Sequence, residues 1–262
     1  MTEYETLTIE LLDFVAIITL NRPERRNALN DQLLRELRSC LQELNGDARV
    51  RAAVLAGAGQ TFCAGADLAG YSRLPTPDEV EEILLKHFNP VILLLAELPI
   101  PVIAAVNGAA AGAGAALALA CDLRVMANDA ALIMAFSNVG LSPDSGASWF
   151  LARQLGYSRA FELLAEGARI PASRCLELGL ANRVASSSSV LAAALGWAGE
   201  MAGRPTLALS LTKRALVSAQ VLDLDNQLTL EARLQRESCA SHDYREGVKA
   251  FLEKRKPRFL GR

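Results

Sequence analysis

The sequence predicts an α/β fold in which a core of alternating strands and helices is followed by a helical region. Two observations support this prediction. Through about residue 140, short apolar runs rich in β-branched residues alternate with segments of helical periodicity, as in α/β proteins. Beyond Ser145 the pattern becomes mostly helical. The 262 residues are enough to bury a substantial core, and we expect that core at 1–189 and the helical region at 190–262.

The elements of the first half follow from apolar patterning and from turn residues. Two apolar runs with alternating character meet near Asp13, which is typical of a hairpin. A capping residue precedes the next helical segment, and a glycine ends it. In order, we predict a hairpin over 6–21, a helix from Asn30 or Asp31 to Gly46, a buried strand over 51–59 and an amphipathic helix over 77–97.

The second half begins with strands and continues with helices. We predict strands over 101–106, 123–128 and 131–136, helices over 147–155, 158–166 and 172–178, a short strand over 180–185 and three or four helices between Val190 and Lys254. The run Ser186–Ser189 has a composition that cannot pack a core. We therefore expect this run to link the two parts of the chain.

The stretch PVIAAVNGAAAGAGAALALACD, residues 101–122, is the centre of the predicted fold. It reads as a buried strand, a turn at Asn107-Gly108, and a helix whose first turn carries glycine and alanine. The first N–H groups of a helix lack intrahelical partners and lie at the positive end of its dipole. Without side chains in the way, a ligand can approach this backbone closely, so the stretch predicts half of an oxyanion hole. A close-packed buried helix is the structural alternative, and the prolines, Asn107 and glycines argue against a membrane span.

Charge and cysteine content exclude several classes of function. A net charge of −2 gives no electrostatic reason to expect a nucleic-acid partner. The five cysteines are dispersed without CxxC spacing, which fits a reducing compartment and neither a disulfide framework nor a zinc site. The start MTEYETLTIE lacks an apolar signal core, so we expect a cytoplasmic protein without a membrane partner.

Few residues remain that could carry chemistry. The chain has two histidines, no GxSxG elbow, no Walker-type glycine loop and no metal-ligand spacing, so we expect neither a metal nor a separate cofactor. What remains is FCAGADL at 62–68, the central stretch, and Asp144 in GLSPDSG. Each has a structural alternative: FCAGADL could be a loop entering a helix, and Asp144 could cap the helix that begins near Gly146.

Together and in this order, the motifs resemble the crotonase (enoyl-CoA hydratase/isomerase) superfamily almost from end to end. The resemblance is carried by NRPERRNALN, FCAGADL, PVIAAVNGAAAGAG, MAFSNVGLSPDSG and DYREGVKAFLEKRKPRF. It implies a spiral of ββα turns, an acyl-CoA thioester as substrate, and a C-terminal helical region that builds homotrimers or hexamers made of two trimers. Coenzyme A would then be part of the substrate.

The resemblance also implies roles for individual residues. Ala66 and Ala113 would donate backbone N–H groups to the thioester oxygen, and Asp144 would be the working carboxylate. Hydratases of the superfamily place two glutamates where this chain has Ala116 and Phe136, which weighs against hydration because the acid–base pair is absent. The positions that would bind CoA or line its path are Arg25, Arg26, Ala28, Ala64, Gly65, Asp67, Leu68, Gly112, Pro143 and Lys254, with Arg22 as a third arginine that could meet phosphates. For the arginines a solvated basic loop is the alternative, and for Lys254 a surface helix position.

These residues predict an acyl-CoA isomerase that uses an oxyanion-stabilised enolate and a single aspartate as acid and base. Phe136, Leu141 and Trp149 are apolar and near Asp144 in sequence; if they line the pocket, they would raise the pKa of Asp144 by desolvation. The substrate would be an enoyl-CoA or a ring-epoxide acyl-CoA. An enoyl-CoA hydratase and a non-catalytic acyl-CoA-binding subunit are the alternatives.

Overall fold

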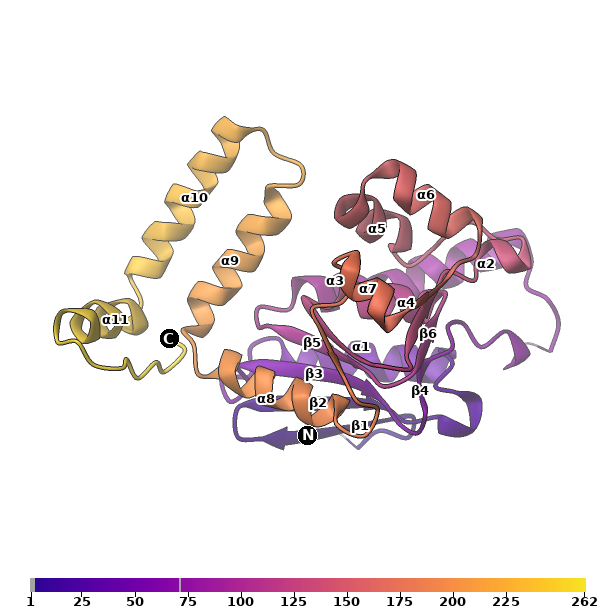
Figure 1. Cartoon of the computed structure of the whole chain (residues 1–262), viewed down its shortest axis with the longest axis horizontal. Helices are drawn as coiled ribbons and strands as arrows, with labels where there is room; N and C mark the ends of the chain where they lie inside the picture. Colours follow the sequence, from indigo (N-terminus) through magenta and orange to yellow (C-terminus); the bar gives the residue numbers. More distant parts are fainter. Residues whose placement is uncertain (1–2, 71) are drawn as a thin grey trace.

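Three consecutive ββα units build the core of the chain. In the computed structural model, which describes residues 3–70 and 72–262, the first strand of each unit lies in a large sheet and the second in a small one. The large sheet has the order β1-β2-β3-β5-β7-β10, and the small sheet has the order β4-β6-β8-β9. This arrangement confirms the predicted α/β class and the ββα spiral (Figure 1).

The strands of the large sheet are parallel except for the first pair. Leu7 pairs with Leu20 and Leu12 with Val15 in the antiparallel hairpin, whose turn contains Asp13 with a positive φ of 52°. The strands are β1 Leu7–Leu12, β2 Val15–Leu20, β3 Ala52–Gly57, β4 Thr61–Cys63, β5 Val102–Val106, β6 Ala109–Ala111, β7 Leu123–Ala127, β8 Ala131–Ile133, β9 Arg169–Pro171 and β10 Arg183–Ala185. The five residues of β5 are all buried, as expected for a strand covered on both faces.

Helices cover both sheets. They are α1 Asp31–Leu44, α2 Pro77–Ile83, α3 Asn89–Glu97, α4 Ala113–Ala120, α5 Ala147–Leu155, α6 Tyr157–Ala165, α7 Ala172–Glu177, α8 Val190–Ala202, α9 Thr206–Ser218, α10 Leu224–Cys239 and α11 His242–Leu252. Asn30 is the residue that caps α1, because its side chain accepts from the Leu33 N–H at 2.9 Å. All eight residues of α4 are buried. Among the described helices, none is long and apolar enough to span a bilayer.

The segment 77–97 is helical throughout, as predicted, but it is not one regular α-helix. Between α2 and α3 the chain makes a π-helical segment at Leu84–Phe88, and the Asn89 N–H donates to the Leu84 carbonyl. Pro90 is the physical reason, because it has no N–H to give to Lys86 and its ring crowds that carbonyl. The alanine strand β6 and the short strand β9 were not predicted, and the strand expected over 131–136 ends at Ile133.

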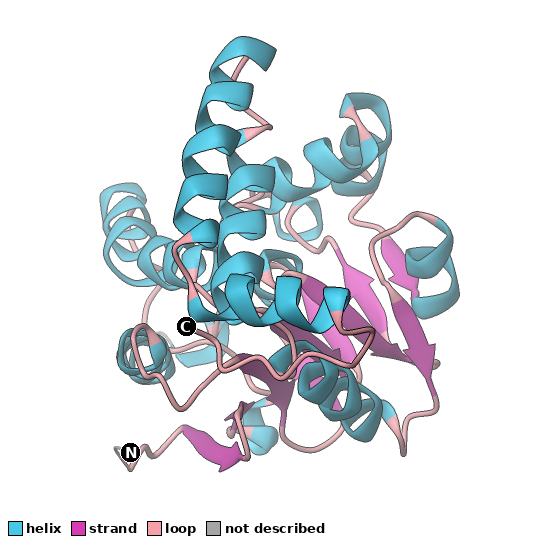
Figure 2. Ribbon diagram, turned by 90° about the vertical axis from the view of Figure 1, so that its left-hand side faces the viewer, coloured by secondary structure: helices cyan, strands magenta, loops and turns pink. Residues whose placement is uncertain are grey.

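The C-terminal helices divide into one that covers the sheet and three that project from it. α8 packs against β3, β5 and β7 and buries Val190, Ala194, Ala198 and Ala202. The helices α9, α10 and α11, here called the arm, extend away from the strands (Figures 1 and 2). The serine run before α8 is tied to the core, since the Ser187 hydroxyl donates to Asp129 at 2.6 Å.

The five cysteines are unpaired and differ in exposure. Cys40, Cys63, Cys121 and Cys175 are buried, whereas Cys239 at the end of α10 is exposed. Burial raises the pKa of the Cys63 and Cys121 thiols to about 12. The buried thiols therefore behave as small apolar side chains.

Candidate active site

Two backbone N–H groups lie free of internal partners where the oxyanion hole was predicted. Leu29 and Ala66 form an isolated parallel β-bridge. The Leu29 carbonyl accepts from the Asp67 N–H at 3.0 Å, and the Leu29 N–H donates to the Gly65 carbonyl at 2.7 Å. Because the groups on both sides of Ala66 face Leu29, the N–H of Ala66 itself points away from Leu29. Ala113 is the first residue of α4, where no intrahelical acceptor exists. Within the described part of the chain, neither N–H donates a hydrogen bond to a protein acceptor.

Glycines bring these two segments into direct contact. A Cβ placed on Gly65 would lie 2.7 Å from the Ala111 carbonyl oxygen and 3.5 Å from the Ala113 nitrogen, and the φ of Gly65 is +92°. Both facts require glycine at this position. The loop that carries Ala66 therefore lies against the turn that carries Ala113, as two halves of one oxyanion hole must.

A partly buried ion pair joins the loop 64–68 to the segment after β2. The Arg22 guanidinium contacts the Asp67 carboxylate at 2.9 Å and also donates to the Ala28 carbonyl. Arg22 is therefore engaged by the protein rather than free for phosphate. Arg25 and Arg26 are exposed, and among the described residues neither forms an ion pair. They remain the cations of this loop that are available to a ligand.

Asn27 was not singled out in the sequence, and it holds this loop in place. Its side chain is fully buried, donates to the carbonyls of Ala58 and Thr61 at 2.9 and 2.7 Å, and accepts from the Arg22 N–H. Its φ of 55° is a left-handed conformation that asparagine adopts more readily than most residues. The only signal in the sequence was an asparagine after two arginines, which does not indicate burial.

The predicted CoA-path residues of the first two motifs cluster at one edge. Ala28 is buried beneath the loop, Gly65 is buried beside the turn, and Ala64 and Leu68 are exposed. Gly112 precedes α4 with a φ of +51°. Ala64, Leu68 and Gly112 lie on the two segments that the Gly65 contact joins, and the Leu29 N–H bond to the Gly65 carbonyl brings Ala28 beside them.

Asp144 is half-buried, and its side chain does not cap α5. The N-cap of α5 is Gly146, which has no side chain, so the capping alternative is wrong. Burial raises the pKa of Asp144 above its ordinary value, and the hydrogen bond from the Ser145 hydroxyl at 2.9 Å opposes part of this rise. Ser145 itself is buried with a φ of +51°, so the turn that presents Asp144 is tightly constrained.

The two positions that hold glutamate in hydratases meet in an apolar cluster. Ala116 and Phe136 are buried together with Ala147, and Leu164 packs against them. Phe136 also lies beside Gly112, since a Cβ on that glycine would be 3.8 Å from the Phe136 ring. Neither position therefore brings an ionisable side chain into this part of the core.

Leu141 and Trp149 line two different cavities. Leu141 and Pro143 line a groove of about 360 Å³ between the start of α5 and α6. Trp149 lines a cleft of about 550 Å³ between α3, α5 and α9, which also contains Ser145 and Gly146.

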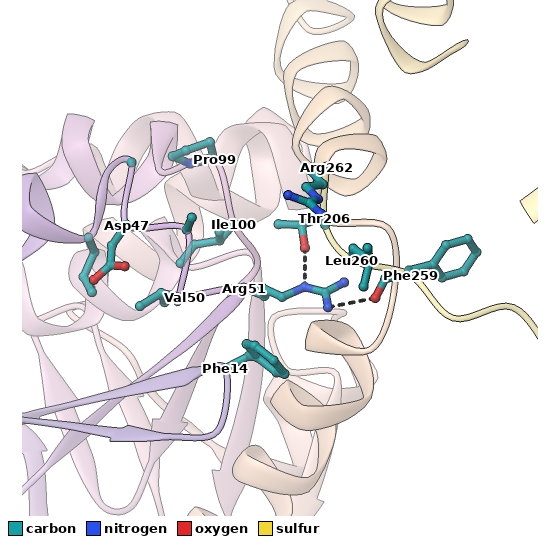
Figure 3. A pocket seen from close by; sticks show the side chains of 14 residues that line it. Phe14, Asp47, Val50, Arg51, Pro99, Ile100, Thr206, Phe259, Leu260 and Arg262 are labelled. Atoms are coloured by element: carbon teal, nitrogen blue, oxygen red, sulfur yellow. Dashed lines mark hydrogen bonds between the residues drawn. The ribbon is translucent and has the colours of Figure 1, made fainter. Parts of the chain in front are cut away.

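Lys254 is the predicted site residue that lies far from the others within one chain. It follows α11, which is at the opposite end of the molecule from β4 and β6 (Figure 1). A further pocket, of about 600 Å³, lies between the core and the C-terminal segment and contains none of the predicted site residues (Figure 3). Within residues 3–70 and 72–262, no cluster of three or more His, Cys, Asp or Glu side chains could hold a metal ion.

Comparisons with known sequences identify the family of the chain. A sequence profile described as enoyl-CoA hydratase/isomerase matches residues 12–262. The chain is 44% identical over 251 residues, 95% of either chain, to the 1,2-epoxyphenylacetyl-CoA isomerase of Escherichia coli. It is 41% identical over 259 residues, 99% of either chain, to a probable enoyl-CoA hydratase of Rhodobacter capsulatus.

Solved structures give the same result. The crystal structure of an enoyl-CoA hydratase from Polaromonas matches with a TM-score of 0.92 and 38% identity, covering 97% of this chain and 99% of that one. An enoyl-CoA hydratase from Bacillus anthracis matches with a TM-score of 0.93 and 33% identity, covering 98% of this chain and 100% of that one. The chain is therefore an enzyme of the enoyl-CoA hydratase/isomerase family, within the crotonase superfamily.

Proposed function

We propose that this enzyme is an acyl-CoA isomerase that works through an oxyanion-stabilised enolate and a single aspartate. The observation that carries the proposal is the contrast between Asp144 and the apolar cluster. Ala116 and Phe136 cannot activate water, whereas Asp144 is a half-buried carboxylate with a raised pKa. One carboxylate is sufficient to move a proton but does not provide the acid–base pair of a hydratase.

On a 3-enoyl-CoA, Asp144 and the two N–H donors would be sufficient for the whole proton transfer. Asp144 takes a proton from carbon 2, and the electron pair moves into a dienolate whose negative oxygen receives the N–H groups of Ala66 and Ala113. Protonated Asp144 then returns the proton to carbon 4, and the double bond moves from position 3 to position 2. Each such N–H donor typically contributes about 2.7–4 kcal/mol to lowering the barrier.

A ring-epoxide acyl-CoA is the other substrate that the proposal includes. The similarity to the E. coli 1,2-epoxyphenylacetyl-CoA isomerase supports it, and with it a place in phenylacetate degradation. Ring expansion breaks the carbon–carbon bond of the epoxide and forms the oxepin. If Asp144 also takes a proton from the carbon next to the thioester carbonyl, the electron pair moves onto the thioester oxygen, and the proton then returns to a ring carbon. The same two N–H donors would therefore serve both substrates. Hydration is the second candidate, favoured by the similarity to relatives named enoyl-CoA hydratases.

The proposal has parts that concern binding and assembly. Arg25 and Arg26 would meet CoA phosphates, because they are exposed cations beside the loop 64–68. Lys254 would reach CoA bound to a neighbouring subunit of a homotrimer, or of a hexamer made of two trimers, since it lies far from its own site. Coenzyme A would be the only cofactor-like group, as part of the substrate, and the enzyme would act in the cytoplasm.

The decisive experiment replaces Asp144 by asparagine. Asp144→Asn keeps the shape and can still accept from Ser145, but it cannot remove a proton. We expect acyl-CoA binding close to wild type and a loss of 3-enoyl-CoA isomerisation of about 10²–10⁴-fold, the usual contribution of a general base. Asp13→Asn is the matched control, because that exposed hairpin turn accepts asparagine at positive φ.

Product analysis separates the candidates. In heavy water the wild type should place deuterium on carbon 2 or carbon 4 and form little 3-hydroxyacyl-CoA. If 3-hydroxyacyl-CoA is the main product, the enzyme is a hydratase despite its apolar cluster. If wild type and Asp144→Asn both bind CoA esters and convert none of a broad panel, the chain is a binding subunit.

The pH dependence gives an independent test of Asp144. The raised pKa means that the proton is held more tightly in the folded state, so turnover should fall on acidification at a pH above the usual range for aspartate. The stability that protonation contributes is complete below the unfolded-state pKa and is lost as pH rises through the folded-state pKa. Asp144→Asn should therefore have a higher Tm than wild type at neutral pH, and the difference should shrink in acid. A Tm difference that is absent at neutral pH, or that does not shrink in acid, would contradict the raised pKa.

A further inference from the structure

Arg124, on β7 directly after α4, is a buried cation without a carboxylate partner. It is only 4% exposed, and its guanidinium donates to neutral oxygens of four residues: Leu119, Cys121, Gln154 and Leu180. Within the described residues, no acidic side chain forms an ion pair with it; the adjacent Asp122 pairs with Lys213 instead. Burial lowers the pKa of Arg124, yet a guanidinium stays protonated in proteins. A buried charge of this kind is costly, so its position requires a reason.

Two of these hydrogen bonds cap the C-terminal end of α4. Arg124 donates to the Cys121 carbonyl at 2.8 Å and to the Leu119 carbonyl at 3.3 Å, both at the C-terminal end of the helix. The last carbonyls of a helix have no intrahelical partner and carry its partial negative charge. The guanidinium therefore satisfies the end of α4 opposite to the Ala113 N–H.

Helix α4 is held by packing, and it has no polar side chain of its own that could fix its position along its axis. It consists only of alanine, glycine and leucine, has eight residues, and has no side-chain cap at its N-terminus. A helix this short is not stable without tertiary contacts. Near its N-terminus, a Cβ on Gly114 would lie 2.8 Å from the Cys63 Cβ, so backbone contact with β4 fixes that end. Arg124 fixes the C-terminal end. Its bonds to Gln154 and Leu180 connect this end of α4 to α5 and to the loop before β10.

We propose that Arg124 is a positioning residue for the oxyanion hole: by holding the C-terminal carbonyls of α4, it sets where the Ala113 N–H lies relative to the Ala66 N–H. This inference rests on the proposed role of these two N–H groups. Arg124 touches no substrate in this scheme and acts only through α4. A misplacement of about 1 Å at reacting groups can cost about 10²-fold in rate.

The chain offers a matched control in Arg51. This arginine is 6% exposed and also donates only to neutral oxygens, those of Thr206 at 2.9 Å, Phe259 at 3.1 Å and Arg204 at 2.6 Å (Figure 3). It joins the core to the C-terminal segment and has no contact with α4. Removing either guanidinium leaves unsatisfied carbonyls, so the two changes are comparable in their structural cost.

The test compares Arg124→Met, Arg124→Lys and Arg51→Met in the full chain. Thermal unfolding, kcat and KM would be measured at a temperature where every variant is folded. The stretching frequency of the thioester carbonyl would be measured with bound butanoyl-CoA, which cannot isomerise. We expect both methionine variants to lose a similar amount of Tm. Only Arg124→Met should lose kcat, by about 10- to 100-fold with a smaller change in KM. In Arg124→Met the carbonyl frequency of bound butanoyl-CoA should return toward that of free butanoyl-CoA. In Arg124→Lys the frequency should lie between the values for Arg124→Met and wild type.

The outcomes are distinguishable from a failure of the proposed function. Equal losses of kcat in Arg124→Met and Arg51→Met, or an unchanged carbonyl frequency in both Arg124 variants, would overturn the inference. If Arg124→Met does not fold, Arg124→Lys carries the comparison, because it keeps the charge and loses the fork that bonds two carbonyls at once. If the wild type isomerises nothing but polarises the butanoyl-CoA carbonyl, the proposed function fails while the carbonyl frequency still tests Arg124. A wild type that leaves the carbonyl unpolarised would overturn both.

Discussion

The surroundings of α4 and the surface of the arm differ in how closely their backbone and side chains are packed. Around α4 the backbone segments touch, and a single methyl group on Gly65 or Gly114 would collide with a neighbouring chain segment. On the arm, large apolar side chains are exposed, among them Val221 at 71%, Leu224 at 74% and Phe251 at 81%. Gln227 of α10 also has a buried side-chain oxygen for which no partner exists among the described residues.

The difference shows which parts of the molecule are complete within one chain. The two segments that carry the Ala66 and Ala113 N–H groups meet through close backbone packing within one chain. The arm has apolar surface and a buried polar atom that its own chain does not satisfy, which is typical of a surface that packs against another protein. We therefore expect substitutions around α4 to damage each protomer and substitutions on the arm to change assembly alone.

Among changes that compare α4 with the arm, the largest effect is expected from Ala113→Pro. Proline is well accepted at the first position of a helix, so the change removes the N–H with little harm to α4. Loss of one oxyanion donor should lower kcat by about 10²–10³-fold, measured with a 3-enoyl-CoA. Ala113→Gly keeps the donor and should be mild. Equal damage from both changes would mean that packing at this position matters and the N–H does not.

A pair of glycine substitutions tests the close packing itself. Gly114→Ala should lower the free energy of unfolding by about 1–3 kcal/mol, since the new methyl group meets Cys63. Gly196→Ala in α8 has no neighbour within 4 Å and should raise it by about 0.5–1 kcal/mol, because alanine favours helix. Urea unfolding measures both. If Gly114→Ala also stabilises, α4 and β4 are less tightly packed than the structure indicates.

The smallest effect on the folded protomer is expected on the arm. Val221→Lys combined with Leu224→Lys changes two exposed residues, so the free energy of unfolding of the protomer should change by no more than about 0.5 kcal/mol. Sedimentation should nevertheless shift from a multiple of three times 28.1 kDa toward the single chain. Leu74→Lys, outside the arm and 86% exposed, is the control that should leave assembly intact. Unchanged sedimentation of the double variant would show that this end of the arm is not an interface.

Much of the fold was predictable because its signals are local. The hairpin, α1 and the buried strand β5 each carry a complete pattern of apolar spacing, caps and turns in adjacent residues. The strand β6 could not be predicted, because three alanines have no preference for a strand and pair only when β4 and β8 lie on either side.

The site was predictable where chemistry depends on residue type and not where it depends on contact. Asp144 and the two alanines were identified through the order of motifs, and the absence of glutamate at Ala116 and Phe136 is visible in the sequence. The engagement of Arg22 by Asp67 depends on a contact across 45 residues of chain. The buried positions of Asn27 and Arg124 likewise depend on carbonyl groups from distant segments, which no local pattern reveals.

The contrast among the cysteines makes the protein convenient for labelling. Burial raises the pKa of Cys40 to about 12 and that of Cys175 to about 11, so these thiols do not form thiolates under ordinary labelling conditions. Cys239 is exposed on the arm, and a maleimide dye or spin label should therefore attach to each subunit once without mutagenesis. The distance between labels in an assembly, and the slowing of the labelling reaction when subunits associate, would report on the arrangement of the arms directly.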